Sequence, residues 1–182
     1  MAAALHEAIA ANDLVQTSAL LGSGASPGSR NGAGWPALHA AAARDASAIV
    51  ARLLEAGADI DAVAGTDELI DRERHAGTAT ALMVALHAGH EDIALLLLER
   101  GANIDHVDAF TRVDALFLAA EQGFERAVER ILLRGPARQA KLFNEKSALD
   151  AAVERGHVGI VRRLLGAGFS ATPAAERLAA SR

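Results

Sequence analysis

The feature that most constrains the fold is one register that runs through the whole chain. It is marked by five leucines, each followed three residues later by an alanine and nineteen residues later by a glycine. The leucines are Leu5, Leu38, Leu82, Leu116 and Leu149; the alanines are Ala8, Ala41, Ala85, Ala119 and Ala152; the glycines are Gly24, Gly57, Gly101, Gly135 and Gly168. A fixed internal period of this kind indicates stacked supersecondary units.

Each unit is predicted to contain two short helices separated by a left-handed turn. The turn stands seven residues after the leading leucine, at Asn12, Asp45, Gly89, Gly123 and Gly156, which are the residue types that best tolerate positive φ. The closing glycine suits the end of the second helix, where the backbone also turns left-handed. A leucine pair near that end is expected to face the next unit: Leu20–Leu21, Leu53–Leu54, Leu97–Leu98, Leu132–Leu133 and Leu164–Leu165.

Capping residues mark several helix starts. Thr80, Asp114 and Ser147 stand two residues before a leading leucine and can accept from unpaired helix amides, for about 1 kcal/mol each. Pro36 holds this position in the second unit, so we predict that the helix there frays more than its equivalents. Gln16–Thr17 replaces the usual apolar pair of a second helix, which predicts a solvated outer face. Thr172–Pro173 predicts a short terminal helix.

The composition limits the fold classes and the kinds of partner that we expect for this chain. Hydrophobic residues make up 51% of the chain but aromatic residues only 3%, which favours closely packed helices over a β-sandwich. The net charge of −5 gives no reason to expect a nucleic acid. The chain has no cysteine, which is compatible with a reducing compartment. Its start resembles no signal peptide and no apolar stretch could span a membrane, so we expect a cytoplasmic protein without a membrane partner.

The repeated residues resemble the ankyrin repeat, whose signature is T-P-L-H-x-A with a period of 33 residues. The matching segments are Pro36–Ala41, Thr80–Ala85 and Ser147–Ala152; the Gly-His pairs Gly89–His90 and Gly156–His157; and the endings Gly57–Asp61 and Gly101–Asp105. The resemblance covers roughly residues 3–169. It implies an all-α ankyrin-repeat solenoid of five helix-turn-helix repeats with short β-hairpin fingers. It also implies that His39 supports a finger by hydrogen bonds.

We expect a single domain over residues 1–182, with repeats near 3–30, 36–63, 80–107, 114–140 and 147–170 and a C-terminal cap at 171–182. The leading leucines lie 33, 44, 34 and 33 residues apart. The larger interval therefore predicts a long insertion within 64–77, in the finger between the second and third repeats. We interpret it as a projecting finger or as a tolerated surface insertion, which costs little free energy.

Three motifs could carry chemistry, and each has a plainer interpretation. Gly24–Gly28 matches G-x-S-x-G, but Ser26 follows a helix and lacks the strand that a hydrolase nucleophile needs. His87 and His90 could share a metal, yet the Gly-His position already accounts for His90. The acidic residues of 59–71 do not have the spacing of a calcium loop, and a solvated loop suits them better. We therefore predict no enzyme, no cofactor and no metal.

The resemblance places a partner on the finger tips and the inner helices, which together form a concave surface. The chain's only tryptophan falls on a predicted tip, where it could bind a partner or pack against neighbouring fingers. The candidate partner-binding residues are Trp35, Arg44, Leu69, Ile70, His87, Phe110, Arg112, Glu121, Phe143, Lys146, Glu154 and Arg155.

The sequence therefore predicts a monomeric, non-catalytic module that recruits or regulates one protein partner. An alternative is a bacterial effector or an immunity protein that neutralises a toxin, since alanine- and arginine-rich usage hints at a bacterial source. A small hydrolase or a metal-binding protein would need a closed pocket, which a thin stack of repeats rarely offers.

Overall fold

The computed structural model describes residues 1–64, 78–109, 111–135 and 146–181, and these contain eleven α-helices. The helices are α1 (Ala2–Ala10), α2 (Leu14–Gly22), α3 (Ala37–Ala42), α4 (Ser47–Glu55), α5 (Ala81–Ala88), α6 (Glu91–Glu99), α7 (Ala115–Gln122), α8 (Glu125–Leu133), α9 (Ala148–Arg155), α10 (Val158–Gly166) and α11 (Pro173–Ala180). The chain divides into two compact units, Met1–Ala102 and Asn103–Arg182.

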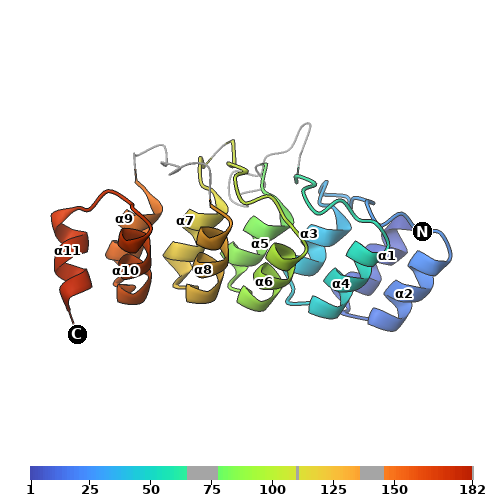
Figure 1. Ribbon diagram of the computed structural model, residues 1–182. Coiled ribbons are helices and arrows are strands. Elements are labelled where there is room, and N and C mark those ends of the chain that lie inside the picture. The colour runs from blue at the N-terminus through green and yellow to red at the C-terminus, as the bar shows by residue number, and fades with distance from the viewer. Residues whose placement is uncertain (65–77, 110, 136–145, 182) are drawn as a thin grey trace. The chain divides into compact units, whose positions relative to one another are not determined.

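The first unit contains three helix pairs. Helices α1 and α2, α3 and α4, and α5 and α6 pack as pairs, and the first members form an inner row in which α3 contacts both α1 and α5. The second members form an outer row in which α4 contacts both α2 and α6. In Figure 1 the segment that joins α2 to α3, and the described ends of the segment between α4 and α5, leave the helices on one side.

The second unit repeats this arrangement with two pairs, α7 with α8 and α9 with α10. Here too the inner helices α7 and α9 pack together, as do the outer helices α8 and α10. The predicted short terminal helix is present as α11, which packs against both α9 and α10. The all-α fold of paired helices is therefore confirmed.

The predicted left-handed turns are all present. The five residues between paired helices have φ values from 52° to 91°, and the five closing glycines have values from 64° to 91°. The leading leucines are at most 2% exposed and the alanines three residues later at most 4%. The alanines leave little side chain between the helices, which is why the inner row can pack closely.

The predicted burial of the leucine pairs is confirmed only in part. Leu53, Leu97, Leu98 and Leu164 are buried as expected, but the pair Leu20–Leu21 is only half-buried. In the fourth repeat the side chain in register is Ile131, which is fully buried, whereas Leu133 is 77% exposed. The prediction placed this pair one residue too late, and one residue turns a helical side chain by about 100°.

The predicted caps are present and Pro36 supplies none. The amides of Met83, Phe117 and Asp150 donate to Thr80, Asp114 and Ser147 at 3.4, 2.7 and 3.3 Å. The amide of Ala175 donates to Thr172 at 3.2 Å. No side chain caps α3, which is six residues long.

The outer face of α2 follows the prediction at one residue and contradicts it at the next. Gln16 is exposed, as expected for a solvated face. Thr17 is fully buried, at the repeat position where Val50 and Val161 are also fully buried, and its hydroxyl oxygen has no hydrogen-bond partner. The methyl group of Thr17 therefore packs where a valine side chain packs in the second and fifth repeats.

The described parts of the first two fingers contain less regular structure than β-hairpins. In the described residues the first finger (residues 25–36) and the second finger (58–64 and 78–80) contain isolated bridges, Arg30 with Pro36 and Val63 with Thr80. The expected insertion falls mostly within 65–77, outside the described residues. Within the described part of the chain, no helix is long and apolar enough to cross a membrane.

Candidate partner-binding surface

Trp35 is the second-last residue of the first finger, and its side chain is half-buried. Its ring meets the ring of His39 edge-on, with centroids 6.4 Å apart and planes at 74°. Asn31 holds its backbone at both ends: the Trp35 amide donates to Asn31 Oδ1 at 3.0 Å, and the Asn31 amide donates to the Trp35 carbonyl at 3.0 Å. The tryptophan therefore packs on one side and remains partly exposed in a fixed position.

His39 lies beneath this tryptophan, fully buried at the start of α3. Its Nε2 lies 2.9 Å from the carbonyl of Ala79, so we assign the proton to Nε2. The buried Nδ1 has no partner. Burial lowers the pKa of His39 to about 4, with the Ala79 carbonyl acting in the opposite direction and the charge of Arg30 adding to the lowering. The expected support of a finger by His39 is confirmed.

Arg44 and His87 are exposed at the ends of two neighbouring inner helices. Arg44 follows α3 and its Nη1 donates to the carbonyl of Ala40 at 3.1 Å. His87 lies in the last turn of α5. Within the first unit the two side chains are therefore exposed at the C-terminal ends of α3 and α5.

His90 is directed towards the repeat before its own. Its Nε2 lies 3.4 Å from the Ala43 carbonyl, and its Nδ1 lies 3.8 Å from an Asp45 carboxylate oxygen. Both ring nitrogens thus face the preceding repeat. Among the described residues there is no group of three histidine, aspartate or glutamate side chains that could hold a metal ion.

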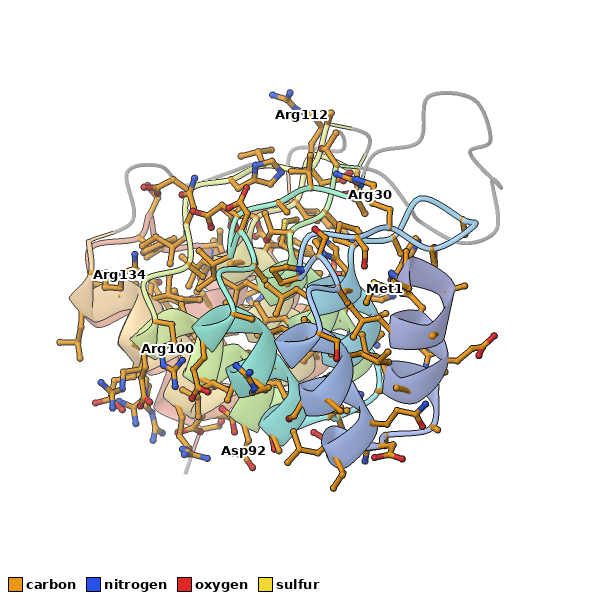
Figure 2. The ribbon with its side chains drawn as sticks, turned by 90° about the vertical axis from the view of Figure 1, so that its right-hand side faces the viewer. Met1, Arg30, Asp92, Arg100, Arg112 and Arg134 are labelled. Carbon is orange, nitrogen blue, oxygen red and sulfur yellow. The ribbon has the colours of Figure 1, made fainter. Side chains whose placement is uncertain are left out.

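Arg112 projects from the finger at 103–113 in the second unit. The turn beneath it is held by Asp108, whose Oδ1 accepts from the amide and hydroxyl of Thr111 at 2.7 and 2.9 Å. The amide of Arg112 donates to the Asp108 carbonyl at 2.9 Å. Arg112 has a φ of 63°, which is strained for a residue other than glycine. Figure 2 shows its side chain pointing away from the ribbon.

The other described candidates of the second unit form two ion pairs. Arg155 Nη2 lies 2.9 Å from Glu121 Oε1, which joins α9 to α7. Lys146 Nζ lies 2.6 Å from Glu154 Oε1, which joins the segment before α9 to the last turn of that helix. The structure therefore brings four predicted residues together as pairs, on α7, on α9 and just before α9. Leu69, Ile70, Phe110 and Phe143 lie outside the described residues.

Sequence reasoning missed Asn31, which is hydrogen-bonded to the backbone of Trp35, and Arg30, which donates to the carbonyl of the neighbouring Gly34. Asn31 precedes Gly32, and such a pair is a turn signal that could have identified it. Nothing in the sequence distinguishes Arg30 from an ordinary surface arginine. Ser26 is exposed in a turn after α2, so it lacks the strand that a nucleophile motif requires.

Comparison with known proteins agrees with the repeat geometry. A family model described as ankyrin repeats (3 copies) matches residues 5–108. The chain is 34% identical over 150 residues to the B-cell lymphoma 3 protein homolog of Mus musculus, covering 82% of this chain and 32% of that protein. It is 32% identical over 149 residues to the human B-cell lymphoma 3 protein, covering 82% and 31%.

The chain thus spans about a third of the length of these curated relatives. Both relatives are mammalian, so they lend no support to a bacterial source for this protein. The match to the family model covers more than half of the chain, and the paired helices and left-handed turns recur in the register of the repeats. The chain belongs to the ankyrin-repeat family.

Proposed function

We propose that this ankyrin-repeat chain is a non-catalytic module that binds one protein partner through its finger tips and the exposed ends of its inner helices. In the first unit the described part of this surface is formed by Trp35, Arg44 and His87. In the second unit it is formed by Arg112 and the two ion pairs of α7 and α9.

The observation that carries this proposal is the fixed, partly exposed ring of Trp35. Tryptophan is among the residues most enriched at interface hot spots. Asn31 and His39 order its backbone and ring before any partner arrives. Binding through this side chain therefore costs little additional conformational entropy.

The charged residues favour selectivity over raw affinity. Glu121 is already paired with Arg155, and Lys146 with Glu154. A partner must match this pattern or break the pairs, and exposed pairs contribute only about 0–1 kcal/mol each. We propose that they fix the orientation of the partner.

The proposal includes the absence of catalysis and a cytoplasmic location. The position of Ser26 in a turn and the engagement of His90 with the preceding repeat support the first part. The lack of cysteine is compatible with a reducing compartment.

Affinity capture with mass spectrometry, followed by calorimetry with the purified partner, tests the proposal. We expect Trp35→Ala to weaken binding roughly tenfold or more, as for a hot-spot side chain, with unchanged helical circular dichroism. Arg112→Ala is expected to weaken it by a smaller factor. Deletion of residues 66–76 tests the contribution of the insertion.

Two exposed residues provide matched controls. Val15 is an apolar side chain on α2 that is 81% exposed, and Arg177 is an exposed arginine on α11. Alanine at either position should leave the affinity unchanged. If Trp35→Ala, Arg112→Ala and the deletion combined also leave it unchanged, the surface is assigned wrongly.

A further inference from the structure

Arg30 uses both terminal nitrogens of its guanidinium within the protein. It lies in the first finger, in the bridge with Pro36. Its Nη1 donates to the carbonyl of Gly34 at 2.8 Å, and its Nη2 donates to the carbonyl of Val63 at 3.1 Å. Arg30 is exposed, and exposed arginines ordinarily keep their charged end in water. A double engagement with two fingers therefore calls for an explanation.

The two carbonyl groups that accept from Arg30 lie next to Trp35 and in the second finger. Gly34 directly precedes Trp35 and has a φ of 77°, so it sets the direction in which the tryptophan leaves the turn. Val63 belongs to the second finger, where it bridges to Thr80. One side chain thus connects the backbone next to Trp35 with the second finger.

His39 makes a second connection between the same two fingers. Its ring contacts Trp35, and its Nε2 reaches the Ala79 carbonyl, which also accepts from the Ala64 amide at 3.0 Å. Arg30 therefore holds the incoming side of the second finger, at Val63, and His39 holds the returning side, at Ala79. Trp35 lies between these two connections in the chain.

The first finger needs such ties because of its sequence. It contains Gly28, Gly32 and Gly34 within a short segment that has a single bridge. Glycine loses more conformational freedom on ordering than any other residue. Without a side chain that closes the turn, a tryptophan on this finger would sample many orientations.

We infer that Arg30 is a positioning residue, which fixes the orientation of Trp35 and couples it to the second finger. The inference rests on the proposed role of Trp35 in binding. Arginine suits the task because its planar fork presents two donors to two carbonyls at once, whereas lysine offers one compact ammonium group. In this role Arg30 shapes the surface without contacting the partner.

Hydrogen exchange of the free protein tests this inference. The reporter is the amide of Trp35, which is bonded to Asn31 Oδ1. We expect Arg30→Ala to lower its protection roughly three- to fivefold, as for the loss of exposed hydrogen bonds, and Arg30→Lys to give an intermediate loss. Acrylamide quenching of Trp35, the only tryptophan, should increase in the same order.

Arg100→Ala is the matched control, because Arg100 is an exposed arginine of the same unit and Figure 2 shows it away from Arg30. It should leave Trp35 protection and quenching unchanged. Thermal unfolding followed by circular dichroism separates local from global loosening, since a purely structural role would lower protection throughout the unit.

Two results would overturn the inference. The first is wild-type protection of Trp35 in Arg30→Ala, which would show that Arg30 does not hold it; weaker partner binding by the same variant would then make Arg30 a direct contact. The second is wild-type protection in Arg30→Lys, which would show that the fork is unnecessary. Exchange and quenching require no partner, so failure of Trp35→Ala to weaken binding would remove the proposed function alone.

Discussion

Gly123 and His157 lie in direct contact at the turn between α7 and α8. A Cβ atom on Gly123 would come within 2.8 Å of Cε1 and 3.0 Å of Nε2 of His157. His157 is held there because its Nε2 lies 3.1 Å from the carbonyl of Glu121. Asp45 and His90 are the equivalent pair in the first unit, and there the ring lies 3.4 Å from the Ala43 carbonyl. The histidine thus reaches the corresponding carbonyl of the preceding repeat in both units.

This contact predicts that Gly123→Ala strongly lowers the free energy of unfolding. The substitution meets both an unfavourable φ of 83° and the histidine ring, whereas Gly156→Ala meets a φ of 75° with no atom within 4 Å. We expect Gly156→Ala to cost about 1–2 kcal/mol of unfolding free energy and Gly123→Ala at least about 1 kcal/mol more. Urea unfolding measures both, and equal losses would refute the role of the contact.

Arg112→Gly is expected to stabilise the protein while weakening binding. Arg112, at a φ of 63°, occupies the repeat position of Gly34, four residues before the leading leucine. Relief of left-handed strain should exceed the added entropy of the unfolded chain, for a net gain of about 0.5–1 kcal/mol.

Asn12→Gly is the control for Arg112→Gly, since asparagine at a φ of 52° tolerates this conformation better. Its gain in thermal stability should therefore be smaller. An Arg112→Gly variant that melts below the wild type would contradict the strain argument.

The lowered pKa of His39 predicts that the free energy of unfolding decreases at acid pH. Its pKa in the folded chain is lowered from 6.5 to about 4, so the unfolded chain binds the proton more readily. The contribution of the neutral imidazole is complete above pH 6.5 and is lost as the pH falls towards 4. At pH 5 the loss from this residue should be on the order of 2 kcal/mol.

His39→Gln separates this titration from the hydrogen bond, because a glutamine amide can still donate to the Ala79 carbonyl but does not titrate. Urea unfolding at several pH values should give this variant a shallower slope between pH 6.5 and 4 than the wild type. Identical slopes would mean that another group causes the acid sensitivity.

Amide exchange at the start of α3 tests the missing cap. The amides of Met83, Phe117 and Asp150 have side-chain acceptors, while the equivalent amide of His39 has no cap from Pro36. A cap contributes about 1 kcal/mol, so we expect protection of His39 to be roughly fivefold lower. Equal or greater protection would show that burial of this turn replaces the cap.

The helical frame could be predicted because its signals are local. A glycine or asparagine at a left-handed turn and a threonine before a helix act within a few residues, so their spacing fixes where helices begin and end. Thr17 and Leu133 were misjudged because burial depends on which face of a helix meets a neighbour, and that depends on single-residue differences in phase.

The surface was less predictable for a related reason. The pairing of Glu121 with Arg155 joins residues 34 apart in sequence, and the contact of Arg30 with Val63 joins residues 33 apart. Repeat spacing indicates that such residues belong to neighbouring repeats. It does not specify which of several exposed side chains will meet.

The constant distance between the two left-handed turns of each repeat has a consequence for how this protein can change. In all five repeats the closing glycine stands twelve positions after the residue that forms the turn behind the inner helix, whereas the leading leucines lie 33, 44, 34 and 33 residues apart. Insertions between a closing glycine and the next leucine leave the pairing of helices untouched. Natural selection can therefore lengthen the loop between two repeats without rebuilding the scaffold that carries it.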